Sequence, residues 1–371
     1  MKKQIIITRI LEFGGSNTYL KTLIRYHGKD NVFLVLVKKE ERKLLDRVAA
    51  LNEDAVVYFP AFKEKIEFKQ NAWVSNLREG TSLLKSLFKI FRLSAKNSFA
   101  PVSISVIDPE KYLYLLWLPF IRVTYILHTL PHVTNNLFTT ATCNIRLGSR
   151  KKIITVSDSN RESIVTRWRI NKKKEGHVHV IYNCLGGGNG EVAKPILLAG
   201  EQNVVTMGHV AGYKNPQLWL QVAEKITQQC PTVYFYWLGN GEFLEEFKER
   251  TKDKKQINFV GLITQPEAYL ANASIYYQPS LMESHGIAVV EAMSHQLPCV
   301  VSNVGGLRES VEHNKNGFVV DPWNVTENVE RLLQLLDNYK LRRSMGSYSL
   351  DRYHKMFTYD SFKQNMDNIN A

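Results

Sequence analysis

The sequence predicts an α/β protein made of two Rossmann-like, doubly wound domains that face a cleft. Short apolar runs of strand length alternate with helix-length segments, and these units form two series separated by a glycine-rich segment. Continuous apolar runs suit a parallel sheet, because its strands are buried on both faces. The length of 371 residues also exceeds the usual size of a single hydrophobic core.

The first series contains six runs that are rich in β-forming residues, each followed by a helix-length segment. They are IIIT (5–8), VFLVLV (32–37), AVVYF (55–59), VSISVI (102–107), VTYIL (123–127) and IITVS (153–157). The apolar stretch before Arg9 is too short for a signal peptide, so we expect a buried first strand there.

A glycine cluster followed by proline, NCLGGGNGEVAKP (183–195), is typical of a linker. The second series is VVTMG (204–208), VYFYWLG (233–239), INFVG (257–261), SIYYQPS (274–280), PCVVS (298–302) and GFVVD (317–321). Three of these runs end in glycine at the carboxyl end of the strand, where ligands bind in open α/β sheets.

The predicted organisation is an N-terminal domain at 1–182, a linker at 183–202 and a C-terminal domain at 203–350. Helical spacing of apolar residues begins after Val325, with Thr326 as the expected N-cap. The segment 351–371 is expected to be helical and can pack back on the N-terminal domain.

The composition narrows the class of protein. Four cysteines stand far apart without a C-x-x-C pair, which predicts reduced thiols in a cytosolic chain. No stretch approaches the roughly 18 uninterrupted apolar residues of a membrane span. No D-x-D motif follows a strand, so we expect neither a metal nor a cofactor.

Two glutamates, Glu283 and Glu291, stand on either side of Gly286. A strand should end near Ser280 and a helix should begin at Gly286, where free backbone N–H groups favour an anion. Carboxylates bind sugar hydroxyls well. A ligand with hydroxyl groups at both ends and a diphosphate between them, such as a nucleotide-sugar, would suit this arrangement.

The segment PSLMESHGIAVVEAM (279–293) with LPCVVSNVGGLRE (297–309) resembles the signature of the group 1 (family 4) retaining glycosyltransferases, which have the GT-B fold. Other elements resemble that family in chain order: Gly14-Gly15, HTLPH (128–132), ITVSDSN (154–160), VIYN (180–183), GHVAGYKNP (208–216), LGNGE (238–242) and INFVG (257–261). The resemblance spans nearly the whole chain.

The resemblance implies catalytic roles for three residues. Glu283 would contact the donor sugar, and Lys214 would neutralise the leaving diphosphate without a metal. His128 would face the acceptor near the anomeric carbon. Taken without the resemblance, His128 is equally compatible with a hydrogen-bonded core histidine, and Lys214 with a solvated lysine.

The resemblance also implies residues that bind the donor, and they outnumber the three catalytic residues. Glu291 would bind the ribose hydroxyls, and its apolar helix argues against a plain surface carboxylate. Gly15 would let a loop of the N-terminal domain approach the phosphates. The full set of implied donor-binding residues is Gly15, His209, Lys214, Gly239, Glu283, Ser284, His285, Gly286, Ile287 and Glu291.

His209 departs from the family, which usually has arginine at this position. Histidine has an ordinary pKa near 6.5 and lacks the bidentate fork of arginine, so it holds a phosphate less firmly at pH 7. Either the donor is gripped differently, or turnover is slower and more dependent on pH.

The charge is concentrated in the first half. Residues 1–180 carry 31 Lys+Arg and 15 Asp+Glu, a net of +16, and the remainder carries 17 and 20, a net of −3. Within this half, TSLLKSLFKIFRLSAK (81–96) places Leu84, Leu87, Phe88 and Phe91 on one helical face and Lys85, Lys89, Arg92 and Lys96 on another. Such a helix either packs on a core or lies on an anionic membrane. We expect peripheral membrane contact, and no nucleic-acid partner.

The function expected from these residues is transfer of a sugar from a nucleotide-sugar donor to a hydroxyl of a cell-envelope or capsular glycan, and we expect this acceptor to be lipid-linked. The enzyme would be cytoplasmic and peripheral on the inner face of the cell membrane. Two alternatives stay open: an inactive GT-B partner that stabilises another glycosyltransferase, and a nucleotide-sugar epimerase.

Overall fold

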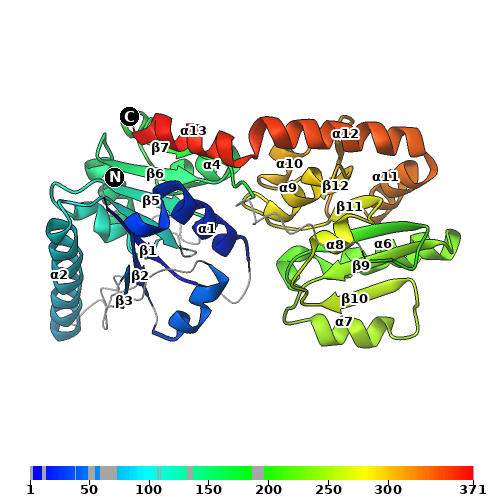
Figure 1. Cartoon of the computed structure of the whole chain (residues 1–371), viewed down its shortest axis with the longest axis horizontal. Helices are drawn as coiled ribbons and strands as arrows, with labels where there is room; N and C mark the ends of the chain where they lie inside the picture. Colours follow the sequence, from blue (N-terminus) through cyan, green and yellow to red (C-terminus); the bar gives the residue numbers. More distant parts are fainter. Residues whose placement is uncertain are drawn as a thin grey trace. The chain divides into compact units, whose positions relative to one another are not determined.

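The computed structural model describes residues 3–370 apart from 11–13, 38, 49–54, 59–72, 107, 109, 132–136 and 186–195. The chain forms two compact units, each with its own sheet (Figure 1). Unit 1 comprises Met1–Tyr182 with Lys363–Ala371, and unit 2 comprises Asn183–Phe362. The glycine cluster expected to form a linker, 186–190, lies outside the described residues.

Unit 1 is built on a seven-stranded parallel sheet with the order β3-β2-β1-β4-β5-β6-β7. The strands are β1 (Gln4–Thr8), β2 (Val32–Leu36), β3 (Val56–Tyr58), β4 (Val102–Val106), β5 (Val123–Leu127), β6 (Lys151–Thr155) and β7 (Val178–Val180). The six expected runs all form strands. Only β7 was not expected, because its three residues, VHV, are too few to give a periodic signal.

The strands of unit 1 are connected by α-helices and by 3-10 helices, and several of these bury apolar residues. The helices are α1 (Gly15–His27), η1 (Lys29–Asn31), η2 (Lys39–Arg47), α2 (Trp73–Lys96), η4 (Leu113–Trp117), α3 (Leu137–Arg146), α4 (Asp158–Arg167) and α5 (Lys172–Glu175). Helix α1 buries Leu20, Leu23 and Ile24, and Ser157 caps α4 by accepting a hydrogen bond from the Asn160 N–H at 3.1 Å.

Unit 2 contains a six-stranded parallel sheet with the order β10-β9-β8-β11-β12-β13. Its strands are β8 (Gln202–Met207), β9 (Val233–Leu238), β10 (Ile257–Gly261), β11 (Ile275–Gln278), β12 (Cys299–Ser302) and β13 (Gly317–Val320). The strand order reverses between β8 and β11. In a doubly wound sheet, the carboxyl ends at such a reversal form the usual ligand site.

The helices of unit 2 connect its strands, and three more, α11, α12 and α13, follow the last strand. They are η5 (Gly212–Lys214), α6 (Pro216–Gln229), α7 (Leu244–Thr251), α8 (Glu267–Leu270), α9 (Ile287–Ser294), α10 (Leu307–Ser310), α11 (Val325–Asp337), α12 (Tyr339–Met356) and α13 (Tyr359–Asn370). Buried Trp219 anchors α6, with its ring centroid 5.4 Å from that of Trp237 and 5.0 Å from that of Phe259.

Two details concern the C-terminal helices. The N-cap of α11 is Asn324, whose side chain accepts from the Glu327 N–H at 3.1 Å, so the expectation of Thr326 was wrong. Asparagine caps more strongly than threonine and stands directly before the first helical residue. The end of α13 belongs to unit 1, where the Tyr26 hydroxyl donates to Asp367 Oδ1 at 2.8 Å.

Helix α2, drawn in cyan in Figure 1, packs by a narrower stripe than expected. Among the side chains of α2 that the structure describes, Ser86, Ile90 and Ser94 are buried, at i, i+4 and i+8. Leu87 and Phe91 are partly buried against the core, but Leu84 is 65% exposed and Phe88 is 64% exposed. The single apolar face expected from the sequence is therefore divided into a part that packs on the core and a part that is exposed.

Candidate active site

The carboxyl ends of β8 and β11 bring two of the expected catalytic residues together. Lys214 lies in η5 after β8, and Glu283 lies in the loop after β11. Lys214 Nζ forms an ion pair and hydrogen bond with Glu283 Oε2, and the two side chains are only 11% and 17% exposed. The pair is therefore shielded from water, which strengthens its attraction compared with an exposed pair.

The loop that carries Glu283 is held by glycines that no other residue could replace without movement. Gly286 has a φ of 88° and is the N-cap of α9, and a Cβ there would lie 2.5 Å from Leu307 Cδ2. A Cβ on Gly305 would lie 1.7 Å from the Glu283 carbonyl oxygen. The Gly306 N–H donates to that same oxygen at 3.3 Å. Close packing of the two loops thus fixes the backbone at Glu283.

Glu291 lies more than one turn inside α9, as its position in the sequence predicts. Burial, helped by the nearby carboxylate of Glu267, raises its pKa to about 7. Among the described residues, no donor contacts its carboxylate. A half-buried carboxylate in this state favours a ligand that brings hydroxyl donors.

His209 and Gly239 occupy the strand ends beside Lys214. His209 is half-buried, and burial and the neighbouring Lys214 lower its pKa, so its imidazole is neutral at pH 7. Gly239 has a φ of 149°, and a Cβ there would lie 2.1 Å from the Gly208 carbonyl oxygen. The observed need for glycine at 239 is thus backbone packing, and its expected donor contact stays a prediction.

His285 stands just before Gly286, the N-cap of α9. The His285 side chain is buried, with its ring centroid 5.5 Å from that of Phe357. Burial lowers its pKa to about 3 and keeps the imidazole neutral. This side chain points into unit 2, so only its main chain suits the expected contact with the donor. The contacts expected of Ser284 and Ile287 also stay predictions.

His128 and Gly15, the expected site residues of unit 1, both lie at carboxyl ends of its strands. His128 follows β5, and its Nε2 lies 2.9 Å from Ser105 Oγ. Its ring meets that of Tyr19 edge to face at 4.7 Å. Burial lowers its pKa to about 4, so the ring is neutral at pH 7. Gly15 is the first residue of α1.

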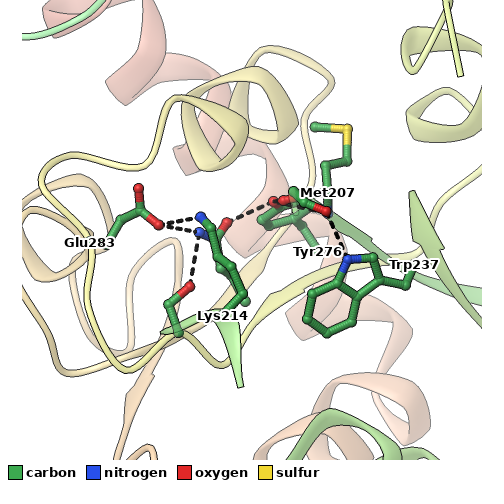
Figure 2. Close-up of polar contacts among 8 residues, drawn as sticks. Met207, Lys214, Trp237, Tyr276 and Glu283 are labelled. Atoms are coloured by element: carbon green, nitrogen blue, oxygen red, sulfur yellow. Dashed lines mark hydrogen bonds and ion pairs between the residues drawn. The ribbon is translucent and has the colours of Figure 1, made fainter. Parts of the chain in front are cut away.

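A buried polar network behind Glu283 was not expected from the sequence. Gln278 Nε2 donates to Glu283 Oε2 at 3.0 Å and to Ser280 Oγ at 3.3 Å, and Gln278 Oε1 accepts from the Tyr276 hydroxyl at 2.7 Å. Figure 2 shows how this network reaches Lys214 and Glu283. The available signal was the glutamine itself, since it is a polar residue that ends a strand buried along its length.

Comparison with known proteins finds a family that resembles most of unit 2. Residues 191–352 match the family model for glycosyl transferases, group 1. The matched residues include the Glu283–Glu291 segment.

Curated relatives match only part of the chain. A protein named as an uncharacterised glycosyltransferase of Haemophilus influenzae is 30% identical over 152 residues, which are 40% of this chain and 43% of that protein. The poly(ribitol-phosphate) α-N-acetylglucosaminyltransferase of Staphylococcus aureus is 24% identical over 170 residues, 44% of this chain and 34% of that protein. The chain thus spans less than half the length of these relatives.

Solved structures match both units. A glycosyltransferase of Rickettsia africae has a TM-score of 0.75 at 14% identity, covering 100% of this chain and 98% of that one. Anabaena HepE in complex with UDP has a TM-score of 0.75 at 15% identity and 98% coverage of both chains. These likenesses confirm the expected two-domain, Rossmann-like GT-B fold.

Proposed function

We propose that this protein is a retaining glycosyltransferase. It takes a sugar from a nucleotide-sugar and transfers it to a hydroxyl of a cell-envelope or capsular glycan whose acceptor end is lipid-linked. The proposal places the donor on unit 2, with its ribose hydroxyls on Glu291, its sugar on Glu283 and its diphosphate near Lys214.

One observation carries the proposal: a desolvated, unpartnered carboxylate and a shielded lysine–carboxylate pair occupy one end of one sheet. Glu291 lacks a donor partner among the described residues, although burial raises its pKa to about 7. Lys214 and Glu283 form an ion pair with each other. A nucleotide-sugar supplies hydroxyls for both carboxylates and negative charge for the lysine, and so satisfies all three groups.

The proposed chemistry is substitution on one face of the sugar. The acceptor oxygen forms a bond to the anomeric carbon while the bond from that carbon to the diphosphate oxygen breaks, and the acceptor proton passes to the leaving diphosphate. Lys214 stabilises the charge that develops on the leaving group. This role needs no metal ion in the proposal, because the lysine supplies the positive charge.

Two relatives support the kind of acceptor. The S. aureus relative is named for transfer to poly(ribitol-phosphate). An Escherichia coli relative, 28% identical over 142 residues, is named as a galactosyltransferase acting on a diphosphoundecaprenol-linked sugar. Structures of HepE with UDP and with UDP-glucose make uridine nucleotides the first donors to test.

The direct test is transfer to a panel of lipid-linked and glycan acceptors by Lys214→Ala and Glu291→Ala variants. We expect each to lose at least about 100-fold in kcat/KM, because each removes a charged contact made to the donor. Lys225→Ala and Glu330→Ala, which replace exposed residues of unit 2, are matched controls. Full transfer by both site variants would overturn the proposal, and loss of wild-type transfer with a chelator would overturn its metal-free form.

The same assays separate the alternatives. An inactive partner protein should bind no nucleotide or nucleotide-sugar by calorimetry. An epimerase should convert the nucleotide-sugar without any acceptor. The proposed transferase binds the donor and forms product only when an acceptor is present.

We also propose that α2 holds the protein on the inner, anionic face of the cell membrane. Lys85, Lys89, Arg92 and Lys96 are exposed on this helix. Leu84 and Phe88 are exposed beside them, and the half-exposed Phe99 packs edge to face on Phe91. At about 1 kcal/mol for each basic residue near such a surface, the four cations contribute about 4 kcal/mol, enough for reversible association.

The free cysteines and the basic first half of the chain support the proposed location on the inner face of the cell membrane. All four cysteines are free thiols, as suits a reducing compartment. Within the described part of the chain, no helix is both long and apolar enough to cross a membrane.

A further inference from the structure

Gln278 connects the active-site pair to the interior of unit 2. It is the last residue of β11 and is only 1% exposed. Its side chain lies between the Tyr276 hydroxyl, 2.7 Å from Oε1, and the Glu283 carboxylate, 3.0 Å from Nε2. A buried amide with partners at both ends has little freedom to move.

The hydrogen-bond pattern fixes which way this amide points. The Met207 N–H lies 3.4 Å from the Tyr276 hydroxyl oxygen and can only donate to it. The single Tyr276 proton has two acceptors in reach, the Met207 carbonyl oxygen at 3.4 Å and Gln278 Oε1 at 2.7 Å, and the much shorter contact favours Gln278 Oε1. The amide NH₂ must then face Glu283, and its donor role does not depend on an arbitrary assignment of the oxygen and nitrogen.

Both donors that hold Glu283 use the same carboxylate oxygen. Lys214 Nζ and Gln278 Nε2 contact Oε2, and Figure 2 shows dashed lines to that oxygen of Glu283 alone. Oε1 is thus left to accept a hydroxyl of the sugar. When Lys214 turns toward a bound diphosphate, Oε2 keeps one partner, the amide.

We propose that Gln278 is a positioning residue that holds Glu283 aimed at the donor sugar while Lys214 serves the diphosphate. The inference rests on the proposed function and adds to it a residue that does not touch the substrate. It predicts that removal of the amide donor weakens contacts to the sugar and leaves contacts to the nucleotide unchanged.

A second buried hydrogen bond, formed by a residue of the same strand, provides a control for a purely structural role of Gln278. Tyr277, whose side chain points to the other face of β11, donates its hydroxyl to Asn328 Oδ1 at 2.9 Å. Asn328 is fully buried like Gln278, but in the described part of the chain it forms no hydrogen bond with Lys214 or Glu283. Asn328→Leu therefore removes a buried amide–tyrosine hydrogen bond, together with two amide bonds to the Asp321 and Asn324 carbonyls, without removing a contact of the active-site pair.

The first experiment compares Gln278→Met and Asn328→Leu with the wild-type protein. For Gln278→Met we expect kcat to fall by about 10- to 100-fold, as for the loss of a hydrogen bond to a charged group. The Kd for the nucleoside diphosphate, which has no sugar, should change less than about threefold. Asn328→Leu should leave kcat within about threefold. If both variants lower kcat equally, the role of Gln278 is structural and the proposal is overturned. The same holds if Gln278→Met lowers the affinity for the nucleoside diphosphate as much as it lowers kcat.

The second experiment uses Gln278→Glu, which keeps the shape of the side chain. When protonated, the introduced carboxyl can donate to Glu283 as the amide does, and when ionised it repels Glu283. The charged or titratable groups around it are Lys214 of η5, Glu283 of the loop and Tyr276 of β11, and Glu291 and Cys299 lie within electrostatic reach of Tyr276. Activity relative to the wild type should therefore fall by at least about tenfold as the pH rises from 5.5 to 8.

The positioning role of Gln278 and the proposed function are overturned by different results. A pH-independent ratio between Gln278→Glu and the wild type would overturn the positioning role, even if the wild-type protein transfers sugar. Absence of nucleotide-sugar binding and transfer by the wild-type protein would instead overturn the proposed function itself.

Discussion

His209 stands where the family that this chain resembles usually has arginine, and its surroundings predict that donor binding depends on pH. Burial and Lys214 lower its pKa in the ligand-free protein, so it carries no charge at pH 7. A diphosphate bound beside it would stabilise the imidazolium. Binding would then take up a proton, and affinity would increase as the pH falls.

We expect His209→Arg to bind the nucleoside diphosphate about tenfold more tightly than the wild type at pH 8, because arginine is always charged and can bind in a bidentate manner. The advantage should shrink toward pH 5.5, where His209 binds as the cation. Calorimetry across this range measures both values. Because Glu291 titrates in the same range in both proteins, the ratio of the two affinities isolates His209.

The control for this comparison is His354→Arg, which adds the same charge at an exposed position on α12. It should not change affinity by more than about twofold. A constant ratio between His209→Arg and the wild type across the pH range would show that His209 does not meet the diphosphate.

Some site residues could be predicted from the sequence, whereas Gln278 could not, and the difference has a physical reason. Glu283 and Glu291 stand out because a carboxylate in an apolar setting needs a partner. Lys214 is recognisable by its place just past a strand-end glycine. Gln278 escaped notice because its importance lies in which atoms it joins, and the pairing with Tyr276 and Glu283 exists only in the folded chain.

At the scale of elements, strands were the most predictable features, because continuous apolar runs record burial on both faces. The caps and buried faces of the helices were less predictable. The α11 cap at Asn324 and the buried stripe of α2 depend on which neighbour a side chain meets. Sequence periodicity reports only that a face is apolar, and it does not report whether the rest of the unit covers that face.

The exposed apolar residues of α2 lead to a prediction about membrane binding. Leu84→Asp with Phe88→Asp should reduce binding to vesicles that contain anionic lipid by at least about 100-fold, because the change removes two side chains that would insert and adds two negative charges. Vesicle co-sedimentation with and without phosphatidylserine measures this. Both side chains are exposed, so the fold should be retained.

Leu197→Asp, at a position 95% exposed in unit 2, is the matched control and should bind vesicles like the wild type. Equal binding by the α2 variant and the control would place the membrane contact elsewhere. Equal binding to neutral and anionic vesicles would remove the proposed role of the four cations.

At the scale of the whole molecule, the architecture was predictable from the sequence and the chemistry only in outline. Two series of strands define two sheets, and the match to solved GT-B structures over 98% to 100% of the chain confirms that architecture. The sugar, base and acceptor depend on loops and main-chain contacts that the motifs do not determine. Position in the fold thus identifies where the donor should bind. Which nucleotide-sugar is the donor must be determined by binding experiments.

A crystal structure of the protein soaked with UDP-glucose, and then with other nucleotide-sugars in turn, tests the central claim most directly. We predict ribose hydroxyls within hydrogen-bond distance of Glu291, the sugar on Glu283 Oε1, and the diphosphate beside Lys214 and the N-terminus of α9. A donor bound in unit 2 with both carboxylates out of contact, or one bound only elsewhere on the chain, would contradict the account.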